Sequence, residues 1–106
     1  MPTELKTLEE YKNAINDAGD KLVVIDFFAT WCGPCVTLGP QFETISTEQA
    51  DDALYYKVDV DQNKDASQDA SIRCMPTMIY FKNGEEVERQ EGTSADAIKE
   101  AIAKHK

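Results

Sequence analysis

Two cysteines separated by two residues are the feature of this sequence best suited to chemistry. They lie in the run Trp31-Cys32-Gly33-Pro34-Cys35, where an apolar stretch ends and a helical pattern begins. A cysteine at a helix N-terminus meets unpaired backbone N–H groups and a partial positive charge, and both favour the nucleophilic thiolate. Cys35 lies one helical turn deeper, where its sulfur can attack a mixed disulfide formed at Cys32. These residues therefore predict dithiol–disulfide exchange.

Two other uses of this pair remain open: a pair of buried structural thiols, or half of a zinc site. Zinc usually takes four ligands, and the chain offers only Cys74 and His105 besides the pair. Attachment of a c-type haem needs a His directly after the second cysteine, where Val36 stands. We therefore expect no metal and no bound cofactor.

Composition favours one globular domain spanning residues 1–106. The chain is 42% hydrophobic and has a formal net charge of −9. A domain of this length buries roughly two-thirds of the surface that its unfolded chain exposes, so it needs neither a metal nor a structural disulfide to fold. Such an acidic chain is repelled by phosphate groups, so we expect neither nucleic acid nor membrane as a partner.

Three further features favour a cytoplasmic location. The N-terminus has neither the apolar region of a signal peptide nor the Arg-rich character of a transit peptide. The longest apolar run, Leu22–Ala29, is interrupted by Asp26 and is too short to span a membrane. The chain has three cysteines, whereas secreted disulfide frameworks more often carry an even number spread along the sequence.

Apolar periodicity predicts the elements that position the cysteine pair. A capping box at Thr7-Leu-Glu-Glu10 opens a helix with apolar residues to Ala18, after a short N-terminal segment at 4–6. Strands are predicted over Leu22–Ala29, Leu54–Val60, Thr77–Lys82 and Glu85–Glu91. Further helices are predicted from Cys32 past Ile45, within Asp61–Ser71, and after Ser94. The first of these should have a kink at Pro40. Asn83-Gly84 predicts a tight hairpin turn.

The resulting order, β-α-β-α-β-α-β-β-α, indicates the α/β class. Helices between the early strands require crossover connections, and a hairpin closes the sheet. We therefore predict a central mixed five-stranded sheet flanked on both faces by four helices. Cys32 follows the central strand, and open α/β sheets place their sites beyond the carboxyl ends of such strands.

Essentially the whole chain resembles the thioredoxin family. The residues that carry the resemblance are Asp26-Phe27, Ala29, Trp31-Cys32-Gly33-Pro34-Cys35, Pro40, Lys57, Asp59, Met75-Pro76-Thr77, Gly84 and Gly92. A lone C-x-x-C is weak evidence, but this combination at these distances is specific. The resemblance implies the thioredoxin fold and a protein-disulfide reductase, in which Cys32 attacks the substrate and Cys35 resolves the mixed disulfide.

The resemblance also implies a substrate groove beside the pair. The family proline that matches Pro76 is cis and faces the active-site disulfide, which leaves the Met75 backbone free to bind an extended substrate segment by strand addition. Gly92 and Thr93 would let that segment approach, and Trp31 would cover one side of the groove. Gly33 and Pro34, between the cysteines, resemble the reducing members of the superfamily, whereas isomerases usually have a His there.

Two further residues are assigned roles near the pair. By resemblance, Asp26 is the base that deprotonates Cys35 through water, and desolvation in an apolar strand is expected to raise its pKa. Lys57 lies in a strand expected to neighbour Asp26, where it would hold the carboxylate charged. A polar residue at a strand end that reaches solvent is the alternative for Asp26, and an ordinary surface lysine is the alternative for Lys57.

The family resemblance also implies the partners. The oxidised pair would be reduced by an NADPH-dependent thioredoxin reductase, so that NADPH is used only indirectly, in electron transport and general redox homeostasis of the cell. Disulfide-containing proteins are the expected substrates, and a monomer is the expected state. A redox-gated protein-binding module and a disulfide-forming oxidant remain as alternatives.

Two positions need separate interpretation. Cys74 precedes Met75-Pro76 and is expected on the rim of the groove, either as a spare surface thiol or as a regulatory thiol that links two chains on oxidation, since some animal thioredoxins have a cysteine there. Val36 stands where family members usually carry a basic residue. We expect this departure to affect the fit to a reductase or to acidic substrates more than the acidity of Cys32.

Overall fold

The computed structural model describes residues 1–106, and its elements follow the predicted order. The strands are β1 (Thr3–Glu4), β2 (Val23–Phe28), β3 (Leu54–Asp59), β4 (Thr77–Lys82) and β5 (Glu85–Glu91). The helices are α1 (Leu8–Asn16), α2 (Gly33–Glu48), α3 (Lys64–Asp69) and α4 (Ala95–His105). The predicted boundaries of β4 and β5 coincide with these, the others differ by at most three residues, and α2 continues through Pro40 as expected.

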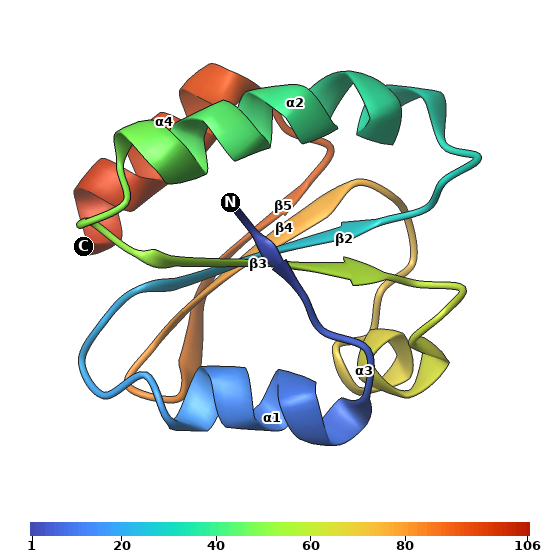
Figure 1. Ribbon diagram of the computed structural model, residues 1–106, viewed down its shortest axis with the longest axis horizontal. Helices are drawn as coiled ribbons and strands as arrows, with labels where there is room; N and C mark the ends of the chain where they lie inside the picture. Colours follow the sequence, from blue (N-terminus) through green and yellow to red (C-terminus); the bar gives the residue numbers. More distant parts are fainter.

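The five strands form one mixed sheet in the order β1-β3-β2-β4-β5. β1, β3 and β2 run parallel, β4 is antiparallel to β2, and β5 is antiparallel to β4. Helices α2 and α4 cover one face of the sheet, and α1 and α3 cover the other (Figure 1). The predicted architecture is therefore confirmed, and β2 lies at the centre with its carboxyl end leading into α2.

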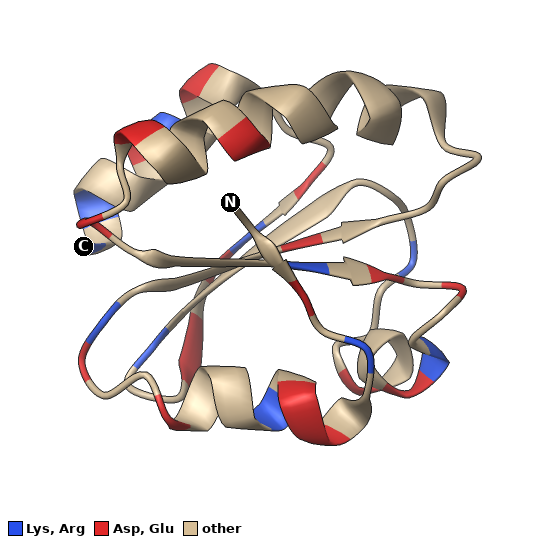
Figure 2. Ribbon diagram, in the orientation of Figure 1, with Lys and Arg blue, Asp and Glu red and all other residues tan.

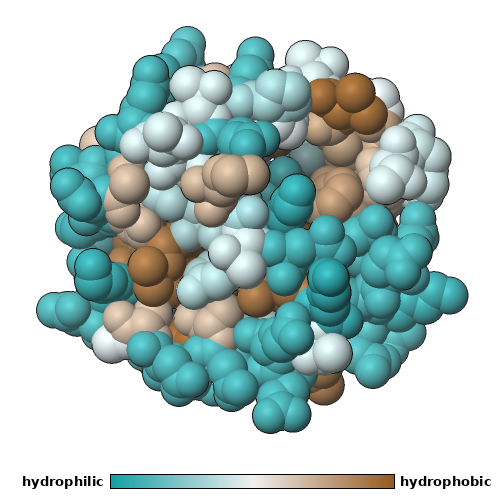
Figure 3. All heavy atoms as spheres, in the orientation of Figure 1, coloured by the Kyte–Doolittle hydropathy of each residue, from teal (hydrophilic) through white to brown (hydrophobic).

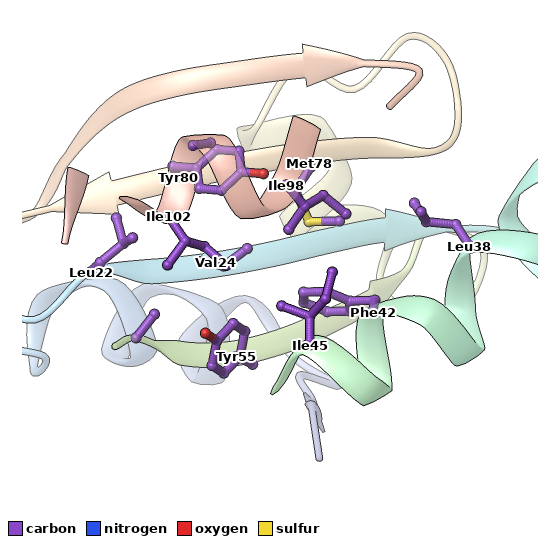
Figure 4. Packing of buried hydrophobic residues seen from close by; sticks show 12 residues of the cluster. Leu22, Val24, Leu38, Phe42, Ile45, Tyr55, Met78, Tyr80, Ile98 and Ile102 are labelled. Atoms are coloured by element: carbon purple, nitrogen blue, oxygen red, sulfur yellow. The ribbon is translucent and has the colours of Figure 1, made fainter. Parts of the chain in front are cut away.

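Each face of the sheet has its own apolar core. Under α2 and α4, a cluster of 12 buried residues joins both helices to the strands (Figure 4). Under α1 and α3, a second cluster of 11 buried residues includes Val23, Ile25 and Phe27. β2 contributes alternate residues to the two clusters, which explains its nearly continuous apolar sequence. Burial on both sides holds the end of β2, and hence the cysteine pair, in a fixed place.

Local hydrogen bonds set the ends of several elements. Thr7 caps α1 by accepting from the N–H of Glu10 at 3.0 Å, and the Glu10 carboxylate in turn accepts from the N–H of Lys6 at 2.8 Å. Ser94 caps α4 through the N–H of Ala97 at 3.2 Å. The hairpin between β4 and β5 turns at Asn83-Gly84, where both residues have positive φ, 55° and 80°.

Charged residues are spread unevenly over the surface. The N-terminal half of α2, which follows the cysteine pair, carries no charged residue (Figure 2). Hydrophilic residues cover most of the face seen in Figure 3, and smaller hydrophobic patches interrupt them. Trp31 and Val36 are 69% and 63% exposed, respectively. The start of α2 therefore presents an uncharged, partly apolar surface. No helix of the chain is both long and apolar enough to span a membrane.

Candidate functional site

The cysteine pair lies at the N-terminus of α2. Cys32 is the N-cap residue, Gly33 and Pro34 form the first turn, and Pro34 occupies a position where an N–H has no helical partner. The backbone N–H of Cys35 donates to Sγ of Cys32 at 3.2 Å. The two sulfurs form a disulfide, with the Cα atoms 5.3 Å apart. A helix terminus and a direct hydrogen bond therefore both act on the sulfur of Cys32, and both favour a negative charge there.

The loop before β4 forms one wall of the site. The Met75–Pro76 peptide bond is cis. The carbonyl oxygen of Met75 is 3.7 Å from Sγ of Cys32, and the N–H of Gly92 donates to the carbonyl oxygen of Pro76 at 2.9 Å. Met75 also packs against the buried cluster of Ala29, Cys32 and Cys35. Met75, Pro76 and Gly92, which are far from the cysteines in sequence, thus lie together beside them.

Trp31 is exposed but held in place. Its indole N–H donates to Oδ2 of Asp61 at 2.8 Å. Asp61 is held in turn, since its backbone N–H donates to Oδ1 of the buried Asp59 at 2.9 Å. The motifs of the sequence did not assign Asp61 a role. One signal was present: Asp61 follows β3, and the carboxyl end of β3 lies beside that of β2 in a parallel pair.

Asp26 is a buried carboxyl group that lines the same cavity as Cys35. It is 4% exposed, and its Oδ1 atom has no hydrogen-bond partner. Burial raises its pKa from 3.8 to about 7, an increase that the positive charge of Lys57 partly opposes. Asp26 and Lys57 are paired residues on the parallel strands β2 and β3. The expected neighbourhood of these two residues is therefore present, and the carboxyl group can gain or lose a proton near neutral pH.

A cavity of about 370 Å³ connects Asp26 with Cys35. Its lining includes Asp26, Cys35, Val36 and Lys57. The other residues around it are Pro2, Phe28, Ala29, Thr30, Gly39, Pro40, Phe42 and Glu43. The cavity provides a space in which a proton can pass between Cys35 and Asp26. The sequence could not reveal it, because its walls come from β2, β3, α2 and the N-terminus.

Cys74 and Thr93 lie beside the groove residues and form no hydrogen bond with the pair. Cys74 is exposed, and its sulfur is 3.9 Å from the hydroxyl of Thr77. Thr93 follows Gly92, and its hydroxyl donates to Oε1 of Gln90 at 2.9 Å. Arg73, just before Cys74, forms two hydrogen bonds of 2.7 Å with Glu91, just before Gly92. The segment that leads into Met75-Pro76 and the segment that leads into Gly92 are therefore tied together.

The comparisons with known proteins agree with this arrangement. The family model described as Thioredoxin matches residues 2–104. Thioredoxin-2 of Saccharomyces cerevisiae is 52% identical over 103 residues, 97% of each chain. Thioredoxin of Ictalurus punctatus is 43% identical over 107 residues, the full length of both chains. The X-ray structure of Fasciola hepatica thioredoxin superposes with a TM-score of 0.93 at 38% identity, covering 98% of this chain and 99% of that one.

Proposed function

The chain belongs to the thioredoxin family, whose members are thiol–disulfide oxidoreductases without a bound cofactor, and we propose that Cys32 is its attacking sulfur and Cys35 its resolving sulfur. The family and the Cys32–Cys35 disulfide establish that the chain reduces protein disulfides. The roles of the individual residues are the proposal. The observation that carries it is the hydrogen bond from the N–H of Cys35 to Sγ of Cys32 at the start of α2.

The first step is attack on the substrate. The thiolate of Cys32 bonds to one sulfur of the substrate disulfide, the substrate S–S bond breaks, and the other substrate sulfur leaves as a thiolate that takes up a proton. Partial positive charge at the helix N-terminus stabilises the thiolate before attack. No Lys or Arg occurs between Lys21 and Lys57, so the helix terminus and the Cys35 N–H are the local sources of this stabilisation.

The second step releases the reduced substrate. Cys35 gives its proton to Asp26 across the cavity that both residues line, and its thiolate then attacks Sγ of Cys32. The bond between Cys32 and the substrate breaks, the Cys32–Cys35 disulfide forms, and the second substrate sulfur leaves as a thiolate. Two electrons pass to the substrate. The raised pKa of Asp26, about 7, supports this role because a base works best when its pKa is near the working pH.

The substrate segment lies in an extended conformation beside Met75 and Pro76. Backbone groups of Met75 would pair with it as in strand addition. Gly92 and Thr93 form the wall beside Pro76, and the exposed indole of Trp31 covers one side of the groove. The short distance between the Met75 carbonyl oxygen and Sγ of Cys32, 3.7 Å, supports this placement because it brings the peptide-binding backbone next to the reactive sulfur.

The same proposal covers the partners and the compartment. A thioredoxin reductase returns two electrons from NADPH to the Cys32–Cys35 disulfide, and the chain then carries them to disulfide-containing proteins in the cytoplasm as part of redox homeostasis. The exposed, unpaired Cys74 supports a reducing compartment. The chain acts as a monomer unless oxidation links two copies through Cys74.

Trapping of the mixed disulfide tests the roles of the two sulfurs. Cys35→Ser should form a stable covalent complex with a disulfide-linked protein such as insulin, because no resolving thiol is left. Cys32→Ser should form none through position 35, because that sulfur lies inside the first turn of α2 and is not the one that receives the hydrogen bond from the Cys35 N–H. Both variants carry Cys74→Ser so that this exposed thiol does not contribute. A complex formed equally well by the Cys32→Ser variant would reverse the assignment.

A further inference from the structure

Gln90 is a polar residue on a side of β5 that faces a core. Strand residues alternate between the two faces of a sheet, and Gln90 pairs with Met78 across the antiparallel β4–β5 ladder. Met78 is fully buried in the cluster under α2 and α4. Figure 4 shows Met78 and Tyr80 among these core residues, next to Ile98 of α4. A side-chain amide that faces a core needs hydrogen-bond partners to replace those it loses from water.

All four hydrogen-bonding positions of the Gln90 side chain are used. Oε1 accepts from the hydroxyl of Tyr80 at 2.8 Å and from the hydroxyl of Thr93 at 2.9 Å. Nε2 donates to the carbonyl oxygen of Ala97 at 3.1 Å and to the carboxylate of Glu88 at 3.3 Å. A side-chain amide offers two acceptor and two donor positions, so none is left unpaired. One side chain therefore joins β4, β5, the loop after β5 and α4.

The partners fix the orientation of the amide. The Ala97 carbonyl and the Glu88 carboxylate can only accept, so the NH₂ group must face them and the oxygen must face the two hydroxyls. Burial, with the nearby Glu88 charge, raises the pKa of Tyr80 well above its ordinary value, so its hydroxyl stays a donor. Thr93 is thus linked to a rigid group whose other three bonds hold it in place.

We propose that Gln90 is a positioning residue for substrate binding, which holds Thr93 and the adjoining Gly92 in the geometry that the substrate segment meets. This inference rests on the groove proposed above, in which these two residues form one wall. Gly92 has a φ of 73°, and its N–H donates to the carbonyl oxygen of Pro76, so the backbone of this wall is tied to the adjacent segment at Pro76. The hydrogen bond from the Thr93 hydroxyl to Gln90 ties this wall to β4, β5 and α4.

The expected effect is on substrate binding rather than on the reaction of the sulfurs. None of the Gln90 side-chain hydrogen bonds involves Cys32, Cys35, Asp26 or Lys57. Loss of one hydrogen bond that orders the groove should raise the KM for a protein disulfide about three- to tenfold. The kcat at saturating substrate, and the rate with a small disulfide that does not fill the groove, should stay within about twofold of wild type.

The test uses the full chain with insulin as the protein disulfide and 2-hydroxyethyl disulfide as the small one. Gln90→Met keeps the length of the side chain and removes the amide, and Gln68→Met, on the exposed surface of α3, is the matched control. Thr93→Val removes the hydroxyl from the other end of the bond, and Thr93→Ser restores it. The double variant Gln90→Met, Thr93→Val should raise KM no more than the larger of the two single changes, because all three variants lose the hydrogen bond between Thr93 and Gln90.

Each result has a distinct meaning. A KM increase for insulin in Gln90→Met and Thr93→Val, with Thr93→Ser and Gln68→Met like wild type, supports the inference. An unchanged KM in both Gln90→Met and Thr93→Val overturns it, as does an equal loss of kcat with both substrates. If Gln90→Met does not fold, the contrast between Thr93→Val and Thr93→Ser still decides. Wild-type protein that fails to reduce insulin would instead overturn the proposed function, and this inference with it.

Discussion

Asp26 and Lys57 are paired residues on the neighbouring strands β2 and β3, and both line the cavity that reaches Cys35. Burial of Asp26 and the charge of Lys57 have opposite effects on the pKa of the Asp26 carboxyl group. Burial favours the neutral carboxyl and raises its pKa to about 7, while the Lys57 charge favours the carboxylate. The balance leaves the Asp26 carboxyl group able to take up or release a proton near neutral pH.

Replacement of Asp26 with Asn should slow the resolving step. An ordinary thiol with a pKa of about 8.5 is only a few per cent thiolate at pH 7, so without its base the step should slow about thirtyfold at that pH. The defect should shrink as pH rises toward 9, where hydroxide can deprotonate the thiol. Single-turnover release of reduced substrate measures this step. Equal rates for wild type and Asp26→Asn at pH 7 would remove Asp26 from the mechanism.

The same substitution should change how stability depends on pH. The pKa of Asp26 is raised from 3.8 to about 7 in the fold, so between these values the folded protein binds a proton that the unfolded chain does not. The free energy of unfolding of the oxidised wild type therefore falls as pH rises through this window, and Asp26 contributes no further change above it. Asp26→Asn has no carboxyl group at this position, so its free energy of unfolding does not show this fall.

Urea unfolding at pH 4 and pH 8 measures this difference. The advantage of Asp26→Asn over wild type should grow between the two pH values by up to about 4 kcal/mol. The comparison of two variants at each pH cancels the general effect of the net charge. A constant difference between them at the two pH values would show that Asp26 titrates normally in the fold.

Replacement of Lys57 with Met should raise the pKa of Asp26, because the charge of Lys57 lowers it. Without the ammonium group the pKa of Asp26 should rise further above its ordinary value, so less carboxylate is available at pH 7. The pH at which the resolving step becomes fast should therefore move upward. The pH profile of single-turnover release measures it, with Lys64→Met on α3 as the control. In the Asp26→Asn background Lys57→Met should have no further effect, and a shift there would assign Lys57 another role.

Cys74 should affect oxidation of the chain but not its reductase activity. Its sulfur is exposed, while Cys32 and Cys35 are 7% and 5% exposed. We expect mild peroxide to produce disulfide-linked dimers of wild type on non-reducing gels, and Cys74→Ser to stay monomeric with unchanged insulin reduction. Equal dimer formation by the two proteins would place the link at another cysteine.

The sequence was sufficient for the fold because its local signals agree with each other. The β-branched and aromatic run of β2 needs two covered faces, and the structure provides helices on both. Thr7, Asn83-Gly84 and Ser94 gave the capping and turn signals that the structure contains. Element ends were less certain, since the helix expected to reach Ala18 ends at Asn16, with Asp17 as its C-cap.

Contacts between distant polar side chains could not be predicted in the same way. The Trp31–Asp61 hydrogen bond spans 30 positions, and it depends on the parallel alignment of β2 and β3. Gln90 lies in a strand whose other residues are mostly charged, although its own side chain faces the core. Its partners come from β4, β5 and α4, so only their packing brings them together. Such residues have no local pattern that identifies them.

The acidity of Cys32 is the most direct test of the whole mechanism. Its sulfur caps α2 and accepts the N–H of Cys35, so the thiolate should be favoured in the reduced protein. The measurement is the pH dependence of iodoacetamide alkylation in a Cys35→Ala, Cys74→Ser variant, compared with the same protein unfolded in urea. We expect the midpoint of the folded protein to lie clearly below that of the unfolded chain. A midpoint equal to or above that of the unfolded chain would contradict the mechanism.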